Sequence, residues 1–262
     1  MQHGTIHLTY PHLVFMNTAA RPKLSADAVV YHRELAPGWE DRYQKRSFRA
    51  RQQALEDSLT GCALAGTNWI DAGCGTGTLS RWLAAQDCKV TGVDAAPDMI
   101  DAAVRLAAQD ANSARLEFTR VATIADLPFA AASVEGVLCS SVLEYVDEPG
   151  CCLEEFARVI RPGGRLVVSV PNKISVIRRG QVMTHRAGYI LGRRWLRFLD
   201  YSRHEYSSHT FRKMLEGHGF RVEHAVSFGS PIPRWLQRMP WGGSLLMFRA
   251  IRRQAGITLH NS

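Results

Sequence analysis

The heptapeptide Asp71-Ala-Gly-Cys-Gly-Thr-Gly77 ends an apolar run that begins at residue 67 and precedes a helical pattern at residues 78–86. Glycine has no Cβ, so such a turn can bend tightly and bring its backbone close to a ligand. The N-terminus of the next helix offers free N–H groups to the same ligand. The pattern is typical of a strand, a ligand-binding turn and a helix, although a turn that only packs helix on strand has a similar composition.

Short apolar runs alternate with helical patterns along the next hundred residues, as in a series of βαβ units. We expect further strands at residues 89–94, 116–121, 134–140 and 165–170, and helices at 97–109 and 149–159. A helix at residues 210–218 and strands at 220–228 and 245–251 follow. The sequence therefore predicts an α/β fold: a Rossmann-like, doubly wound, mostly parallel seven-stranded sheet, with a small cap inserted after the fifth strand.

An acidic residue, Asp94, ends the second predicted strand, 17 residues after Gly77. A carboxylate at this point of a nucleotide-binding fold accepts hydrogen bonds from both hydroxyls of a ribose. The alternative is a capping role ahead of the helix that begins at Pro97. The spacing of the glycines, G-x-G-x-G after an aspartate, differs from the G-x-G-x-x-G fingerprint and disfavours a hydride-transferring dehydrogenase.

Five stretches follow one another along the chain: residues 69–77 (WIDAGCGTG), 92–100 (GVDAAPDMI), 125–129 (ADLPF), 141–146 (SVLEYV) and 159–165 (VIRPGGR). In this order they resemble the motifs of the class I S-adenosylmethionine-dependent methyltransferases, and the resemblance extends over roughly residues 30–228. It implies that S-adenosylmethionine is the cofactor.

The resemblance also implies which residues hold that cofactor. The methionine part would be surrounded by Asp71, Gly73, Cys74, Gly75, Gly77 and Ser140. Asp94 would hold the ribose, and Ala95 and Met99 would flank the adenine. Thr123 stands where the family usually has an aspartate, which leaves the Ile124 backbone to contact the adenine amine. Trp39, Tyr43 and Arg51 resemble the lid helix, in which an arginine pairs with the cofactor carboxylate; a solvated basic helix face is the alternative.

Methyl transfer to a hydroxyl requires a base, because the cofactor supplies only the electrophile. Glu144 follows the fourth strand and is a candidate, although it lies near Asp147 and Glu148 and could be a surface carboxylate. His204, with Tyr206 close by, is a second candidate, because a neutral imidazole accepts protons near pH 7. His185 and Tyr145 are weaker candidates.

The stretch at residues 141–146 is also similar to that of polyprenyl-quinone O-methyltransferases, which carry two glutamates and a histidine there. This chain keeps Glu144 but has Ser141 and Tyr145 at the other two places. We therefore predict no metal site.

Composition limits the class of protein. The chain has 262 residues, of which 46% are hydrophobic and 21% charged, as in a folded globular protein. Its six cysteines form no C-x-x-C pair, and no eighteen apolar residues run together. We predict reduced thiols, no signal peptide and no spanning helix, and hence a cytoplasmic protein that is soluble or peripheral to a membrane.

Charge and motifs together predict the organisation of the chain. Residues 1–172 carry a net charge of −4 and residues 173–262 carry +12. We expect an N-terminal lid and helix (1–60), a cofactor-binding core (61–172), a basic substrate cap (173–206), and a C-terminal helix with the last two strands (207–262). Because basic and apolar side chains interleave in the cap and at residues 231–247, these segments could lie on an anionic membrane or simply pack onto the sheet.

The main hypothesis is O-methylation of a small or lipid-like acceptor, including one that bears phosphate. Nitrogen or carbon methylation of a metabolite remains an alternative, because the acceptor is determined by the cap. The basic half suggests an RNA methyltransferase, but the fourth strand is not followed by an Asn/Asp-Pro-Pro-aromatic run, and no RNA-binding module is recognised. Nucleic acid is therefore disfavoured as a partner. A cofactor-binding scaffold without activity is a minority hypothesis.

Overall fold

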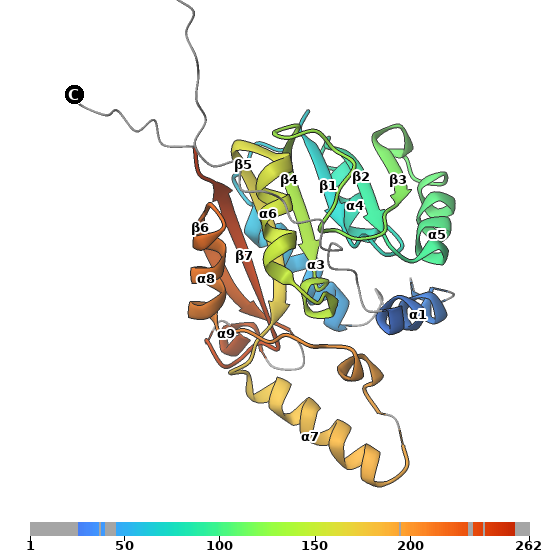
Figure 1. The fold of residues 1–262 in the computed structure, drawn as a ribbon, viewed down its shortest axis with the longest axis vertical. Helices are drawn as coiled ribbons and strands as arrows, with labels where there is room; N and C mark the ends of the chain where they lie inside the picture. The colour runs from blue at the N-terminus through green and yellow to red at the C-terminus, as the bar shows by residue number, and fades with distance from the viewer. Residues whose placement is uncertain are drawn as a thin grey trace, which may run out of the picture.

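The computed structural model describes residues 26–36, 38–39, 46–193, 195–229, 233–237 and 239–254. Seven strands form one sheet in the order β3-β2-β1-β4-β5-β7-β6 (Figure 1). Their bounds are β1 Asn68–Ala72, β2 Lys89–Asp94, β3 Leu116–Arg120, β4 Val134–Ser140, β5 Ile160–Pro171, β6 Phe220–Phe228 and β7 Leu245–Arg252. The predicted seven-stranded, Rossmann-like sheet is confirmed.

The first five strands run parallel, and β7 is antiparallel to both β5 and β6. The carboxyl ends of the parallel strands therefore meet at one edge of the sheet. The strand order reverses beside β1, which lies between β2 and β4. Ligands of open α/β sheets bind outside the carboxyl ends at such a reversal.

Helices cover both faces of the sheet. Those of the body are α3 Arg46–Leu59, α4 Thr78–Ala84, α5 Pro97–Ala107, α6 Pro149–Val159 and α8 Ser208–Gly217. Phe156 of α6 and Phe211 of α8 are buried in the core on one face. Leu55 of α3 and Leu83 of α4 are buried in the core on the other. The sheet therefore has a buried apolar core on each of its faces.

Three sequence features determine where helices begin. Gly77 precedes α4 with φ +76°, and a Cβ there would lie 2.6 Å from the ring of Phe118. Pro97 opens α5, where its missing N–H costs nothing. Ser175 caps α7 (Val176–Ile190) by accepting a hydrogen bond from the Arg178 backbone N–H at 3.3 Å.

Strand β5 is longer than predicted. The sequence analysis places this strand at residues 165–170, but β5 begins at Ile160. Its pairing with β4 shifts register between Val134 and Gly136, so the Pro-Gly-Gly segment is an irregularity within the paired strand. Glycine and proline mark bulges as well as turns, and composition does not distinguish them.

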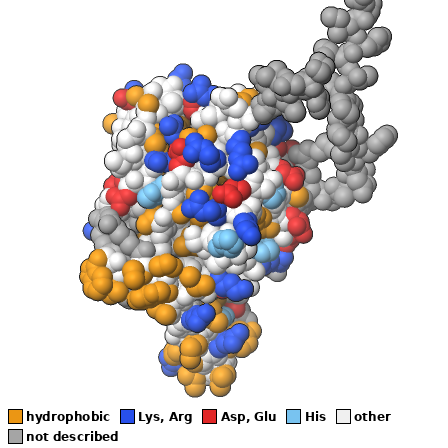
Figure 2. Space-filling model, turned by 90° about the vertical axis from the view of Figure 1, so that its left-hand side faces the viewer, with side chains coloured by type: hydrophobic (Ala, Val, Ile, Leu, Met, Phe, Trp, Pro, Cys, Tyr) orange, Lys and Arg blue, Asp and Glu red, His pale blue; other side chains and the backbone are white. Residues whose placement is uncertain are grey.

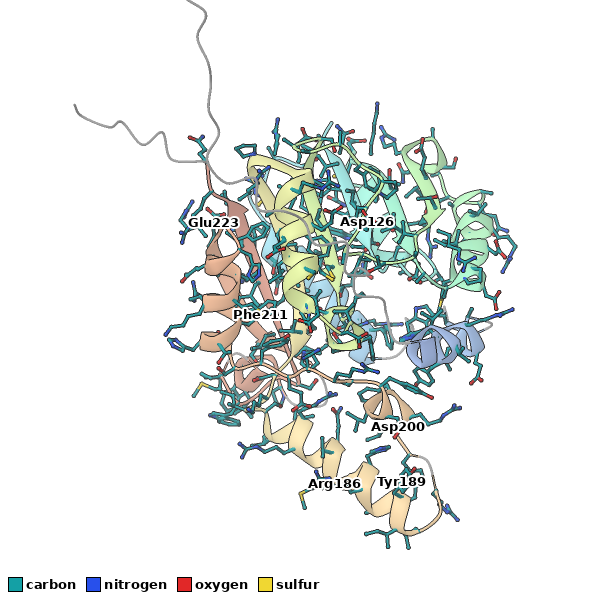
Figure 3. The ribbon with its side chains drawn as sticks, viewed as in Figure 1. Asp126, Arg186, Tyr189, Asp200, Phe211 and Glu223 are labelled. Atoms are coloured by element: carbon teal, nitrogen blue, oxygen red, sulfur yellow. The ribbon has the colours of Figure 1, made fainter. Side chains whose placement is uncertain are left out.

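The cap after β5 contains α7 and the short helix η3 (Arg197–Asp200). Figure 1 shows α7 projecting away from the sheet as an arm. Figure 3 shows Arg186 and Tyr189 on this arm, with Asp200 on the segment that returns toward the body. His185 joins the two segments, since its Nε2 lies 2.9 Å from Asp200 Oδ1.

Four further elements complete the described chain: α1 Ala26–Leu35, η1 Ser113–Arg115, η2 Leu143–Tyr145 and α9 Arg234–Gln237. The sequence analysis gave no bounds for them and expected only a lid and a helix within residues 1–60. Helices α1 and α9 are short or weakly patterned, so periodicity gives little signal for them. In the part of the chain that the structure describes, no helix is long and apolar enough to cross a membrane.

Candidate active site

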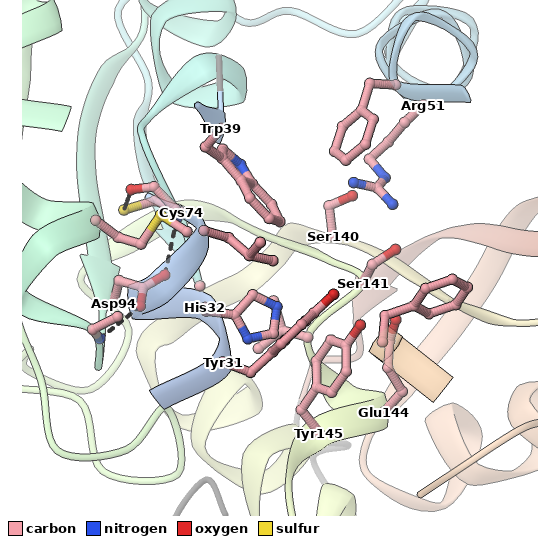
Figure 4. Close-up of a pocket in the computed structure, with 18 of the residues that line it drawn as sticks. Tyr31, His32, Trp39, Arg51, Cys74, Asp94, Ser140, Ser141, Glu144 and Tyr145 are labelled. Carbon is pink, nitrogen blue, oxygen red and sulfur yellow. Dashed lines mark hydrogen bonds between the residues drawn. The ribbon is translucent and has the colours of Figure 1, made fainter. Parts of the chain in front are cut away.

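A cavity of about 710 Å³ opens at the carboxyl ends of β1, β2 and β4. Side chains from α1, α3, α7 and η3 complete its walls. Figure 4 shows Cys74 and Asp94 at one end and Ser141, Glu144 and Tyr145 at the other, with His32 between them. The fold therefore brings the glycine-rich turn and the residues after β4 to one space.

The glycine-rich turn forms the floor of the cavity. The backbone N–H groups of Gly73 and Cys74 both donate to the Val93 carbonyl oxygen, at 2.8 and 3.0 Å. Gly73 has φ +77°, and a Cβ at this position would lie 2.3 Å from Val142. Only glycine allows the chain to turn this closely between the strands. Gly73, Cys74 and Gly75 all line the cavity, a position that fits their predicted contact with the cofactor.

Asp94 is fixed by the backbone on both of its oxygens. Oδ2 accepts from the Gly75 N–H and Oδ1 from the Ala96 N–H, each at 2.9 Å. Burial raises the pKa of Asp94, while these two bonds oppose the rise. Helix α5 has Ala96 and not Asp94 at its N-cap, so Asp94 holds the start of this helix only through the Ala96 N–H. Each oxygen keeps a lone pair for a hydroxyl, which suits the two hydroxyls of a ribose.

Other residues assigned to the cofactor divide into two groups. Ala95, Met99 and Ile124 line the cavity beside Asp94, and Ser140 lines it at the end of β4. Asp71, Gly77 and Thr123 are not part of the cavity wall.

The three residues away from the wall have structural contacts instead. Asp71 is buried behind the turn, accepts from Ser80 Oγ at 2.6 Å, and has a pKa raised to about 7 by burial. Thr123 Oγ1 accepts from the Ala125 N–H at 3.1 Å, and Gly77 packs against Phe118. These three residues support the turn and the loop that line the cavity, and their contact with the cofactor stays a prediction.

The lid residues Trp39 and Arg51 both line the cavity. Arg51 stacks over the Phe48 ring at 4.8 Å, and its Nε is buried with no hydrogen-bond partner among the described residues. An unpaired buried guanidinium nitrogen fits a bound carboxylate. Tyr43, the third predicted lid residue, lies outside the described residues.

Glu144 lies in η2, and its side chain is buried in the cavity wall. Its Oε2 has no hydrogen-bond partner among the described residues. Burial raises the pKa of Glu144 to about 7, although Arg51 and Arg178 lower it. Ser141, three residues earlier, has φ +57°, a rare conformation for serine that turns the chain from β4 into η2. With a pKa of about 7, the Glu144 carboxyl group changes protonation near neutral pH.

The structure does not bring His204, Tyr206 or His185 to the cavity wall. His204 Nε2 lies 3.0 Å from the Val146 carbonyl oxygen, and the His204 ring stacks near Tyr206 at 6.3 Å. His185 connects α7 to η3. The segment at residues 201–206 contacts η2 instead, since the Arg203 N–H donates to the Glu144 carbonyl oxygen at 2.8 Å. The geometry therefore favours Glu144 over His204 and Tyr206 as the base.

Sequence reasoning missed several cavity residues. Tyr31 and His32 of α1 line the cavity, and the His32 ring lies edge-on to Tyr145 with centroids 4.9 Å apart. Tyr31 stacks on Tyr201 at 4.7 Å, which joins α1 to the cap. Arg178 of α7 is also in the wall, although the sequence analysis treated it only as part of the basic cap. No sequence signal identifies these residues, because their partners are distant in the chain.

Comparisons with known proteins agree with this architecture. Residues 70–168 match the methyltransferase domain family. The ubiquinone biosynthesis O-methyltransferase of Xylella fastidiosa (strain 9a5c) is 36% identical over 139 residues, covering 52% of this chain and 55% of that protein. That of Xanthomonas oryzae pv. oryzae (strain PXO99A) is 35% identical over 111 residues, covering 42% and 45%. The chain spans about half the length of these curated relatives.

Solved structures share the fold at low identity. An S-adenosylmethionine-dependent methyltransferase from Mesorhizobium loti superposes with a TM-score of 0.58 at 21% identity, covering 76% of this chain and 96% of that one. Geranyl diphosphate C-methyltransferase from Streptomyces coelicolor A3(2) superposes with a TM-score of 0.57 at 19% identity, covering 77% and 78%. These likenesses support the fold of the core around the cavity.

Proposed function

We propose that this chain, whose core is a class I S-adenosylmethionine-dependent methyltransferase domain, transfers a methyl group to a hydroxyl of a small or lipid-like acceptor. The observation that carries the proposal is the opposition of Asp94 and Glu144 across one cavity. Asp94 offers acceptors for a ribose, and Glu144 offers a buried carboxyl group that titrates near pH 7. The ubiquinone biosynthesis O-methyltransferases among its relatives support a hydroxyl as the accepting group.

The residues of the cavity divide the work between binding and proton removal. When bound, S-adenosylmethionine supplies a methyl group on a positively charged sulfur. Asp94 holds the ribose, the backbone of Gly73–Gly75 approaches the methionine part, and Arg51 pairs with its carboxylate. Glu144 accepts the proton of the acceptor hydroxyl, which makes the oxygen a stronger nucleophile. Alignment of the acceptor oxygen with the methyl group supplies the rest of the rate enhancement.

Nitrogen or carbon methylation is the second candidate function. An amine or carbanion acceptor depends less on a base, so the buried Glu144 favours the hydroxyl. The prediction that no metal takes part stays with the proposal: Ser141 and Tyr145 stand beside Glu144, and neither is a carboxylate or imidazole ligand.

We expect the purified chain to transfer labelled methyl groups from S-adenosylmethionine to hydroxylated aromatic or lipid-like compounds in a screen. Turnover should persist in excess EDTA, because the proposed reaction uses Glu144 as the base and needs no metal ion to acidify the hydroxyl. Product formation is measured by scintillation counting and by mass spectrometry, which distinguishes O-, N- and C-methyl products. Loss of activity in EDTA with recovery in Mg²⁺ would refute the metal-free reaction. Absence of cofactor binding by calorimetry would refute the proposed function as a whole.

We further propose peripheral contact between the cap side of the protein and an anionic membrane. Exposed apolar side chains gather at the start of α7 and around α9: Ile174, Val176, Trp235, Met239 and Trp241. The Val176 N–H donates to the Trp241 carbonyl oxygen at 3.1 Å, which makes these two segments one surface. Figure 2 shows hydrophobic side chains gathered there, with basic side chains beside them on the arm. Their exposure supports membrane contact over packing of the cap onto the sheet.

The wild-type protein should therefore co-sediment with liposomes that contain anionic lipid and not with neutral ones, and 0.5 M salt should weaken the binding. Replacing exposed Lys173, Arg179 and Arg186 with serine removes three charges, each contributing on the order of 1 kcal/mol near the membrane. The triple variant should lose most of the binding. A matched variant with Arg105, Arg115 and Arg120 changed to serine, on α5, η1 and β3, should bind as the wild type does. Equal sedimentation with neutral lipid, or with neither lipid, would contradict the proposal.

A further inference from the structure

Arg178 lies in the first turn of α7, and its guanidinium is part of the cavity wall. Its side chain is only 5% exposed. A buried guanidinium costs several kcal/mol unless hydrogen-bond acceptors satisfy its donors. The contacts of each of its nitrogens therefore indicate whether a ligand belongs beside it.

Two of the three guanidinium nitrogens have protein partners. Nε donates to Glu205 Oε1 at 2.7 Å, and Nη2 donates to Ser202 Oγ at 2.8 Å. The guanidinium carbon also lies over the Phe198 ring, 5.5 Å from its centroid, a cation–π contact. Nη1 has no hydrogen-bond partner among the described residues. A planar cation is thus held from two sides, with the donors of Nη1 left for a ligand.

The surroundings of Arg178 favour an anion. Gln181, one helical turn later, also lines the cavity and adds an amide donor. The first turn of a 15-residue helix carries partial positive charge from its free N–H groups. Two acids are near Arg178: Glu205, outside the cavity wall, pairs with its Nε, and Glu144, whose pKa Arg178 lowers, forms no ion pair with it among the described contacts. The cap end of the cavity is therefore arranged for an anionic oxygen.

We propose that Arg178 and Gln181 form an anion subsite that selects methyl acceptors carrying a carboxylate or phosphate in addition to the hydroxyl that is methylated. The inference rests on the proposed function, since it names the class of acceptor for the same cavity. Glu144 faces the hydroxyl and Arg178 faces the anion, with the aromatic rings of Tyr145 and Phe198 in the wall near them. The acceptor is thus an aromatic or otherwise flat molecule with a hydroxyl at one end and an anionic group at the other.

The test uses three probes of similar shape: 4-hydroxybenzoate, 4-hydroxyphenyl phosphate and the uncharged 4-hydroxybenzamide. Each is titrated by calorimetry into the full chain that has been saturated with S-adenosylhomocysteine, so that the cofactor carboxylate occupies Arg51. At least one charged probe should bind about tenfold more tightly than the amide, as expected for a charge-assisted hydrogen bond. The charged probe that binds more tightly shows whether the subsite recognises a carboxylate or a phosphate.

Four variants separate the subsite from a structural ion pair. Arg178→Gln should reduce the preference for charged probes to less than about threefold, since it removes the cation. Glu205→Gln breaks the same ion pair but keeps the cation, and Arg179→Gln removes the exposed neighbouring charge. Both should keep the preference of the wild type. Arg178→Lys keeps a positive charge and should retain part of the preference for charged probes.

The outcomes are distinguishable from failure of the proposed function. Unchanged affinity for S-adenosylhomocysteine in Arg178→Gln shows that the fold and cofactor site persist. Equal binding of all three probes to the wild type, or binding of none, would overturn the subsite whatever the stability of the variants. A full preference in Arg178→Gln would also overturn it. If the wild type does not bind S-adenosylhomocysteine, the proposed function itself fails.

Discussion

Replacing Glu144 with glutamine should lower kcat by about 10²–10⁴-fold, because the amide cannot accept the proton of the acceptor hydroxyl. The change keeps the shape of the side chain, so the affinity for S-adenosylmethionine should remain that of the wild type. Initial rates with labelled cofactor measure the first effect, and calorimetry measures the second. His204→Ala is the matched comparison, because His204 lies outside the cavity wall. A fully active Glu144→Gln enzyme, or an inactive His204→Ala enzyme that still binds cofactor, would contradict the assignment.

The pH profile gives an independent check on the same residue. Burial raises the pKa of Glu144 to about 7, and a general base works only when it is deprotonated. The wild-type kcat/KM should therefore rise with pH through about 7 and level off above it. The residual activity of Glu144→Gln should lack this rise. A profile that is flat between pH 6 and 8 would count against Glu144 as the base.

The contribution of Glu144 to the free energy of unfolding should fall as pH rises, whereas its contribution to activity rises. The folded-state pKa of Glu144 lies above its ordinary value of 4.5, so the native state holds the proton more tightly than the unfolded chain does. The contribution of this group to stability is present below about pH 4.5 and is lost as pH rises through about 7. Glu144→Gln avoids that loss, which is on the order of 3 kcal/mol at most. The variant should therefore unfold at a higher temperature than the wild type at pH 8, so its inactivity would not reflect unfolding.

The fold was predictable because its signals are local in the chain. Strands β2, β4 and β6 have the predicted bounds, since each is a short apolar run bordered by turn residues or a helix start. Strand β5 differs because the irregular segment at residues 161–164 is paired across the sheet, a contact that composition does not report. Local patterns thus predicted the elements, and pairing between distant segments decided their ends.

The cofactor end of the site was also predictable, whereas the acceptor end was not. Asp94 and Gly73–Gly75 lie on a turn and a strand end that the sequence motif defines directly. The position of Arg178 depends on Glu205, 27 residues away, and that of Tyr31 on its stacking with Tyr201. The sequence analysis placed His204 beside the acceptor, whereas in the structure His204 contacts the Val146 carbonyl oxygen outside the cavity wall. The path of the segment at residues 201–206 past η2 is a tertiary property that local patterns do not report.

The cofactor assignment rests most heavily on Asp94, and its replacement by alanine should weaken binding of S-adenosylmethionine and S-adenosylhomocysteine alike. We expect a loss of about 10- to 100-fold in affinity, corresponding to roughly 1.5–3 kcal/mol for a charged hydrogen-bond partner. Isothermal titration calorimetry with each ligand measures it. Asp101→Ala removes the same charge from an exposed position on α5 and should bind both ligands as the wild type does.

The size of the Asp94 effect follows from how the carboxylate is held. Burial raises its pKa, so keeping the group ionised in the cavity costs free energy that two backbone N–H groups only partly offset. Ribose hydroxyls add two further donors to the same oxygens, and this gain appears only when the cofactor binds. Alanine removes both the free-energy cost of the buried charge and the hydrogen bonds gained on cofactor binding. Affinity for the cofactor should therefore fall strongly, while the unfolding temperature of the free protein should change little. Unchanged affinity in Asp94→Ala would mean that the ribose lies elsewhere in the cavity.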